Sequence, residues 1–232
     1  MQLMTVEKKM NFMTTPMSDN PTSCPIACPT EEAIVVDRYG YILQTGKTGS
    51  SVFLSEGDKM VPLGVLGGEI EIDYIYSNLL QRNATTAKAM WSPFKFRSLV
   101  KTKGEWDLKN NKKTIFGLGN KSKTDFIYEG EPLKSQDIGN HHFGFISKAY
   151  GLFPEEFILR QAGSYQIKSG TSKPEWQQYE HHRFTLNANP VSAGPTVRPM
   201  VAPYGDNPRD QMWIKKGFDD YKRLKIARHN KA

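Results

Sequence analysis

Cysteine is almost absent from this chain of 232 residues, which contains only two. Both of them, Cys24 and Cys28, lie in a proline-rich stretch with no histidine or third cysteine nearby. Two thiols cannot complete a tetrahedral zinc site. The chain after residue 28 has neither a disulfide nor a thiol nucleophile, and we expect no metal and no other cofactor.

Long apolar runs are also absent. No stretch approaches the roughly 18 apolar residues that a membrane-spanning helix needs, so we expect no membrane insertion. The first 23 residues lack the apolar centre of a secretory signal. We therefore expect secretion through a larger parent protein or a specialised secretion system. The P-loop, the G-x-S-x-G elbow, H-E-x-x-H and the dinucleotide fingerprint are missing, which disfavours the enzyme classes that carry them.

Positive charge is in excess. The chain has 31 Lys and Arg against 24 Asp and Glu, a net charge of +7. Residues 97–125 hold eight basic and three acidic side chains, and residues 211–232 hold seven and two. This balance favours a polyanionic partner such as RNA, a bacterial cell-wall polymer or an acidic protein inhibitor. A solvated basic face with a basic tail would give the same composition.

The pattern of turns and apolar residues predicts an α+β protein in three parts. Residues 1–31 are polar and proline-rich, as in a linker or a disordered arm. Residues 32–75 alternate short apolar runs with glycine turns, which predicts a small antiparallel β module. Residues 76–232 are expected to form a mainly helical domain.

Within the third part, helical spacing and capping residues predict several helices. We expect them near 74–91, from Ser92, from the Gly139-Asn140 turn to Gly151, from Pro154, and from Pro208 to the C-terminus. Residues 103–132 are expected to form short strand pieces, and residues 168–209 a long irregular segment.

His141 and His142 are the first candidates for chemistry. A neutral imidazole can take a proton from a ribose 2′-hydroxyl and return it to the leaving 5′-oxygen. Adjacent helical side chains point about 100° apart, so at most one of the two faces a given pocket. Asp137 can orient an imidazole or cap the helix. Histidines that cap a helix or are satisfied in the core explain the pair equally well.

The stretch GEWDLK is the second candidate. Glu105, Asp107 and Lys109 alternate, so on an extended segment they share one face, opposite Trp106. Lys109 can hold a phosphate, and either acid can transfer a proton. A solvated strand face with an internal ion pair is the alternative.

Four stretches in order resemble the bacterial polymorphic toxin type 44 domain. They are GEWDLK, DIGNHHFG, LRQAGSYQ and YGDNPRDQMWIKKGFDDY, and the resemblance covers about residues 76–225. It implies the C-terminal toxic domain of a large secreted antibacterial protein of the Rhs-like or a related type, with a cognate immunity protein. It also directs attention to Trp106, Asp107, Lys109, Gly139, Asn140, Gly144, Gln166, Asp206, Asp210 and Gln211. The two histidines occupy variable positions of that pattern.

Two activities remain open, together with a non-enzymatic binding role. One is a metal-independent ribonuclease acting in the target cytoplasm, and the other is a peptidoglycan glycosidase acting in the target periplasm. The predicted catalytic residues are Asp107, Lys109, Asn140, His141, His142, Glu105 and Asp137. The predicted substrate-binding residues are Trp106, Gln166, Asp206, Asp210 and Gln211. We expect the segments near 107, 140 and 210 to meet in one positively charged cleft, and the immunity protein to be acidic.

Overall fold

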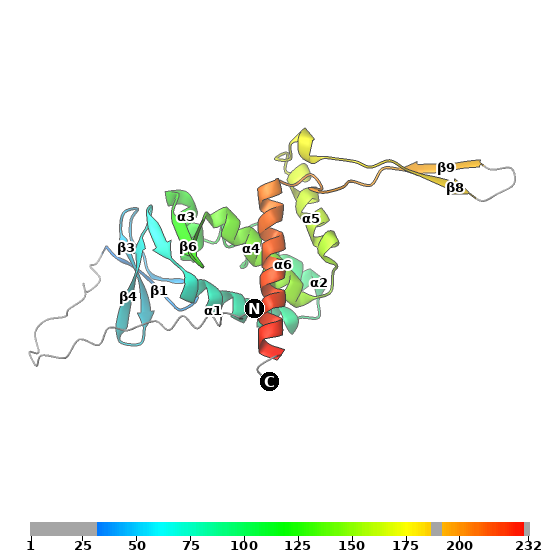
Figure 1. Cartoon of the computed structure of the whole chain (residues 1–232). Coiled ribbons are helices and arrows are strands. Elements are labelled where there is room, and N and C mark those ends of the chain that lie inside the picture. The colour runs from blue at the N-terminus through cyan, green and yellow to red at the C-terminus, as the bar shows by residue number, and fades with distance from the viewer. Residues whose placement is uncertain (1–31, 187–191, 230–232) are drawn as a thin grey trace, which may run out of the picture.

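The structure of the chain, a computed structural model, describes residues 32–186 and 192–229. Within them, strands dominate the first 40 residues and helices dominate the rest. Figure 1 shows the sheet on one side, the helices packed beside it, and a β-hairpin that reaches away from the body. This arrangement confirms the α+β fold class. The expected arm, residues 1–31, lies outside the described residues.

A mixed sheet forms one end of the molecule. Its seven described strands lie in the order β2-β1-β3-β4-β5-β6-β7. They are β1 (Ile34–Val36), β2 (Ile42–Gln44), β3 (Ser51–Glu56), β4 (Lys59–Val65), β5 (Glu69–Glu71), β6 (Asp125–Tyr128) and β7 (Glu131–Leu133).

The expectation of purely antiparallel strands needs a correction. β1 pairs with β3 in parallel, and β5 pairs with β6 in parallel, while the other neighbours are antiparallel. Parallel neighbours need a crossover. The three helices between β5 and β6 supply one. Turn residues predict hairpins only, so these two parallel pairs could not be predicted from the turns.

The sheet and the core continue across residue 75, where we predicted a domain boundary. β6 and β7 follow that position but complete the sheet that β1–β5 begin. One hydrophobic cluster joins Ile34 and Ile70 from the sheet to Ile138 and Trp213 from the helices. The division into a β module and a helical domain stays a prediction, and its two parts share one core.

Six α-helices follow the first five strands within the described residues. They are α1 (Asp73–Lys88), α2 (Pro93–Val100), α3 (Ile115–Ser122), α4 (Ser135–Tyr150), α5 (Glu155–Lys168) and α6 (Pro208–His229). The predicted N-cap of α2 is confirmed, since Ser92 Oγ accepts from the Lys95 N–H at 3.3 Å. The predicted end of α4 is also confirmed, because Gly151 adopts the left-handed conformation there.

The predicted start of α4 was wrong. The helix begins at Ser135, so Gly139 and Asn140 lie within it. An Asp137 carboxylate oxygen accepts from the Lys134 N–H at 2.9 Å and so caps the helix start. Helix α3 was predicted as strand, because its eight residues are too few to show a helical period.

The GEWDLK stretch is not extended, which corrects the prediction that its charged residues share a strand face. Residues 101–114 form consecutive turns, which we call the 101–114 loop. The carboxylate of Asp107 accepts from the Lys103 N–H and from the Asn110 amide, both at 2.8 Å. Asp107 therefore folds the loop around itself, as aspartate often does in turns.

Helices α4 and α6 cross at unusually close range, side by side in Figure 1. A β-carbon on Gly144 would overlap the backbone carbonyl of Ile214, and one on Gly217 would overlap that of His141. Each helix thus presents a glycine to the backbone of the other. This contact fixes the start of α6 beside the start of α4.

The segment predicted as irregular contains a hairpin, which corrects that prediction in part. Strands β8 (His182–Leu186) and β9 (Ser192–Val197) pair with each other and with no other described strand. A short 3₁₀ turn at Pro174–Trp176 precedes them. Of the described helices, none is long and apolar enough to cross a membrane.

Candidate active site

Polar side chains from four separate segments meet where α4 and α6 begin. The segments are the 101–114 loop, the first turns of α4, the end of α5 and the turn into α6. We call these side chains the polar cluster, and its members are Lys109, Gln136, Asp137, Gln166, Asp206, Arg209, Asp210 and Gln211. Asn140 is counted with them because it follows Gln136 by four residues and so shares its face of α4.

Asp210 is the point at which three helices are joined. Its carboxylate accepts from the Gln136 amide at 2.8 and 3.0 Å and from the Gln166 amide at 2.8 Å. Only 4% of Asp210 is exposed. The two amides supply the donors that a buried carboxylate requires, and they tie α4 and α5 to the start of α6.

Asp206 is the group with the most unusual acidity in the polar cluster. It is buried, and its carboxylate accepts from the Gln211 amide and from the Asn207 N–H, each at 3.0 Å. Burial, aided by the charge of Asp210, raises its pKa from 3.8 to about 6, against the opposing effects of Gln211, Asn207 and Lys109. Asp206 therefore exchanges its proton close to neutral pH, as a general acid or base must.

Lys109 brings a positive charge from the 101–114 loop to the polar cluster. Its aliphatic stem lies along Gly139, where a β-carbon would be 3.6 Å from the Lys109 β-carbon. The Asn120 amide donates to its backbone carbonyl at 3.0 Å. Its charge also lowers the pKa of Asp206. Of the residues predicted near 107, Lys109 therefore lies close to the segments near 140 and 210. The Asp107 carboxylate instead bonds within its own loop.

Asp137 is engaged by an arginine that the sequence did not single out. Arg209 donates from Nε and from a terminal nitrogen to the two Asp137 oxygens, both at 2.8 Å. Asp137 is 2% exposed, while the Arg209 side chain is 57% exposed. This two-pronged ion pair connects the starts of α4 and α6. Its geometry gives Asp137 a positioning role.

Two buried atoms of the polar cluster have no hydrogen-bond partner within the described part of the chain. They are the donor Asn140 Nδ2 and the acceptor Gln211 Oε1. Buried polar atoms are nearly always paired, so such atoms call for an explanation. A donor and an acceptor left free in one cluster are available to a bound substrate or water.

His141 lies in the core, away from any surface. It is 0% exposed, with Nε2 2.9 Å from an Asp220 carboxylate oxygen and Nδ1 2.8 Å from the Tyr76 hydroxyl. Burial by itself would raise the pKa of the Asp220 carboxyl. Hydrogen bonds from His141 and Arg223 outweigh this effect of burial and lower the pKa of Asp220 to about 2. The ionised carboxylate only accepts, so Nε2 carries a proton. Tyr76, His141 and Asp220 form a buried chain that joins α1, α4 and α6.

His142 faces the other side of α4 and is also 0% exposed. Burial, together with the charges of His141 and Arg82, lowers its pKa to about 3, although the Trp106 backbone carbonyl, as an acceptor for the ring, opposes this. Since the ring is neutral, Nε2 accepts from the Asn83 amide at 3.0 Å. Nδ1 has no partner of normal geometry among the described residues. Neither histidine belongs to the polar cluster.

The remaining predicted residues lie in the 101–114 loop. Trp106 is buried and packs edge-on against Phe96 and His142, with ring centres 6.2 and 6.3 Å apart. Glu105 is exposed and lines a pocket of about 200 Å³ between α1, α2 and the loop. A second pocket, of about 340 Å³, lies at the hairpin base. The cleft expected over the polar cluster stays a prediction.

The comparisons with known proteins can now be set beside this geometry. The profile of the family described as bacterial toxin 44 matches residues 95–223, which is more than half of the chain. The chain belongs to the bacterial toxin 44 family. No curated protein and no solved structure matches it.

The bacterial toxin 44 region contains every residue that the sequence proposed for the site. It also contains partners that sequence reasoning missed, namely Gln136, Arg209 and Asp220. Arg209 and Asp220 lie in the same terminal helix as Asp210, and a helical projection of α6 would have placed the two on one face. Tyr76 and Asn83 precede the matched region, and nothing in the sequence pairs them with the histidines.

Proposed function

We propose that this toxin domain is a ribonuclease that acts in the cytoplasm of a target bacterium, with the polar cluster as its active site. The observation that carries the proposal is the Asp206 carboxyl, whose pKa is about 6, next to Asp210 and within the field of Lys109. A carboxyl that titrates near neutral pH and a cation are the two groups that metal-free cleavage of RNA requires.

The proposed chemistry is an internal displacement at phosphorus. Asp206, as the carboxylate, takes the proton of the ribose 2′-hydroxyl while that oxygen attacks the adjacent phosphorus. The bond from phosphorus to the 5′-oxygen breaks, and that leaving oxygen takes a proton from water on the opposite side of the phosphorus, while Asp206 keeps the proton of the 2′-hydroxyl until it passes to solvent. Lys109 stabilises the charge that develops on the phosphoryl oxygens. Asn140 and Gln166 are proposed to hold the substrate.

The histidines receive a supporting role in this proposal. Both are enclosed, and neither is in the polar cluster. We propose that His141, through Asp220 and Tyr76, sets the orientation of α4, and that His142 holds α1 through Asn83. The acid–base role that the sequence suggested for an imidazole is reassigned to Asp206.

A peptidoglycan glycosidase remains the second candidate, since glycosidases also use two acidic groups of unlike environment. Asp206 and Asp210 form such a pair, and the amides beside them suit sugar hydroxyls. We therefore predict the outcome of expressing the full chain in a sensitive bacterium, with and without a periplasmic export signal. Growth should stop only without the export signal, and total RNA should be degraded. Lysis that depends on the export signal, with intact RNA, would instead establish the glycosidase.

Removing the charge of Lys109 should abolish most of the toxicity. Methionine keeps the stem that covers Gly139, so Lys109→Met should leave the fold intact. Loss of one group that stabilises transition-state charge typically slows a reaction about 100-fold to 1,000-fold. RNA cleavage by purified protein measures the effect. Lys112→Met, an exposed lysine of the same loop, should cleave at the wild-type rate, and equal rates for both variants would remove Lys109 from the mechanism.

Membership of a toxin family suggests an immunity partner. We propose that this partner is acidic, because the toxin carries a net charge of +7. We further propose that a larger parent protein or a specialised secretion system delivers the domain into the target cell.

A further inference from the structure

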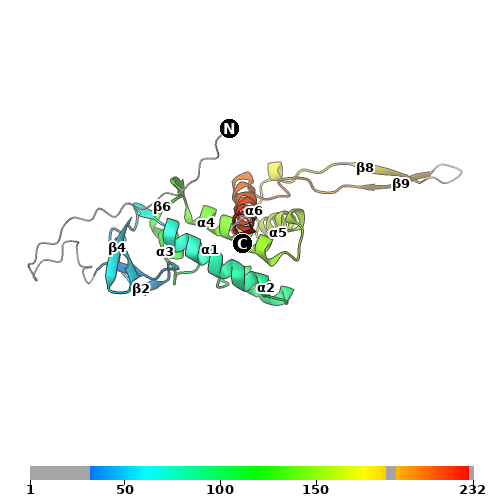
Figure 2. The same cartoon turned by 60° about the horizontal axis from the view of Figure 1, so that its bottom comes forward.

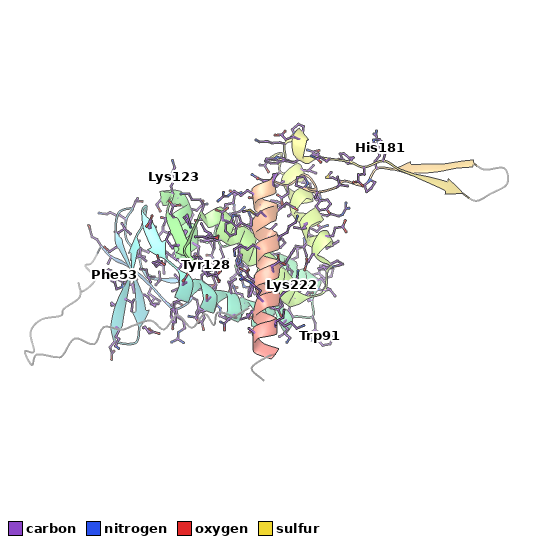
Figure 3. The ribbon with its side chains drawn as sticks, viewed as in Figure 1. Phe53, Trp91, Lys123, Tyr128, His181 and Lys222 are labelled. Atoms are coloured by element: carbon purple, nitrogen blue, oxygen red, sulfur yellow. The ribbon has the colours of Figure 1, made fainter. Side chains whose placement is uncertain are left out.

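Two large aromatic side chains are exposed to solvent at one corner of the helical body. Trp91, in the connection between α1 and α2, is 96% exposed, and Phe94, in the first turn of α2, is 83% exposed. Figure 3 shows Trp91 at the edge of the body remote from the hairpin, and Figure 2 shows α1 and α2 together along one edge. No other large apolar residue that the structure describes is as exposed as these two.

The Trp91 and Phe94 rings do not pack into the hydrophobic core. Helix α2 is anchored by Phe96, which is buried, stacks on Tyr150 at 4.4 Å and meets Trp106 edge-on. Exposed aromatic surface is unfavourable in water, and adjoining exposed aromatic groups often mark a binding surface. Trp91 and Phe94 therefore have the character of contacts for a ligand.

The α1–α2 segment of this corner is strongly basic. Residues 74–104 contain no Asp or Glu but six cations. Five of these are exposed, and none of the five belongs to an ion pair between described residues; they are Lys88, Lys95, Arg97, Lys101 and Lys103. Phe94 and Arg97 are three residues apart, so they share a face of α2. The ligand of this corner is therefore expected to be an anion.

A pocket of about 200 Å³ includes Met90 and Lys95, the chain neighbours of Trp91 and Phe94, in its lining. The lining combines apolar and polar groups with a single acid, Glu105, and consists of Arg82, Asn83, Thr86, Met90, Lys95, Leu99, Glu105 and Trp106. Arg82 is held in place by the Tyr39 and Tyr41 rings, 4.4 and 5.0 Å from its guanidinium carbon. The Glu105 carboxylate disfavours a carboxylate-rich ligand, but it can accept from the amino group of a nucleobase, as acidic residues do from cytosine.

We propose that this corner is a binding platform for single-stranded RNA, separate from the polar cluster. We call it the α1–α2 platform: Trp91 and Phe94 stack on unpaired bases, Lys95 and Arg97 neutralise phosphates, and the pocket accepts one base. Stacking rings set in a basic surface are the common means of binding single strands. Bases in a duplex are already stacked on each other, so the α1–α2 platform favours single strands. This inference rests on the proposed ribonuclease activity and names where its substrate is held.

The test measures binding without cleavage. The full chain with Asp206→Asn is titrated against a labelled single-stranded RNA of 12 nucleotides by fluorescence anisotropy. Adding Trp91→Ala should weaken binding about tenfold, since stacking is worth roughly 1–3 kcal/mol per base. Adding Tyr179→Ala, an exposed aromatic residue at the hairpin base, should leave the Kd unchanged. The Trp91→Ala and Tyr179→Ala chains should have the same Tm.

Three results would overturn the proposal. They are an unchanged Kd after Trp91→Ala together with Phe94→Ala, equal affinity for a 12-base-pair duplex, and equal affinity for polyglutamate of the same length. The last result would mean that an acidic protein is the ligand. Failure of the platform is distinguishable from failure of the ribonuclease. If the wild-type protein leaves RNA intact but Trp91→Ala weakens RNA binding, the α1–α2 platform is supported and the ribonuclease activity is rejected. If the wild-type protein cleaves RNA but Trp91→Ala leaves binding unchanged, only the platform is rejected.

Discussion

Asp206→Asn should abolish toxicity and at the same time stabilise the protein above pH 6. The folded protein holds this proton up to a pKa of about 6, whereas the ordinary value is 3.8. A group with a raised folded pKa gives stability that is complete below pH 3.8 and is lost as the pH rises through 6. Above pH 6 the wild-type protein therefore buries an unfavourable charge, and asparagine removes it.

Asparagine keeps only one of the two acceptor oxygens that Asn207 and Gln211 use, which reduces the stability gain of Asp206→Asn to about 1 kcal/mol at pH 7.5 and makes the variant less stable than wild type near pH 4. Urea denaturation at both pH values measures it. Asp210→Asn is the matched variant. The Asp210 carboxylate accepts three hydrogen bonds from Gln136 and Gln166, and an amide cannot accept them all, so this variant should lose stability as well as toxicity. A stability loss for both variants would contradict the assignment of Asp206.

Asp220→Asn should produce the largest loss of stability in the chain. Its carboxylate is the partner of the fully buried His141 at 2.9 Å. Asparagine removes the charged acceptor of the hydrogen bonds from His141, Lys216 and Arg223, and the loss of such bonds costs on the order of 3 kcal/mol. That loss corresponds to a fall in Tm of roughly 10 °C for a protein of this size.

Asp219→Asn is the control for this variant, because Asp219 is 67% exposed and pairs with Lys222 at the surface. Such a pair contributes less than about 1 kcal/mol, so the Tm should barely move. The pH dependence provides a second check. The pKa of Asp220 is lowered to about 2, so its contribution is present above pH 3.8 and is lost as the pH falls towards 2. Equal Tm values for the two variants would show that the buried chain does not stabilise the fold.

The helices could be predicted where local chemistry sets their ends. Ser92 caps α2, Gly151 ends α4, and Pro208 opens α6, and each of these acts within a few residues. The start of α4 was missed because the Gly139-Asn140 pair resembles a turn, whereas it lies inside the helix. Gly144 and Gly217 are needed for the close contact of α4 with α6, and in one sequence such glycines look the same as turn glycines.

The sequence could suggest which residues lie together more readily than what they do. Lys109, Gln166 and the Asp206–Gln211 segment lie in the polar cluster, and their function as a site stays a prediction. The roles depend on burial and on partners distant in the chain. Nothing local distinguishes the enclosed His141 from an accessible base, since its environment is set by residues 65 and 79 positions away.

The pairing of β5 with β6 has a consequence for where this chain can be divided. The family match begins at residue 95, yet β6 lies beside β5, a strand that comes before it. A fragment starting at residue 95 would leave the β5-facing edge of β6 without a partner and would remove Tyr76 from His141. A fragment starting ahead of Ala33 would keep the sheet together with the helices. A chimaeric fusion of this toxin region should therefore have its junction upstream of the first strand.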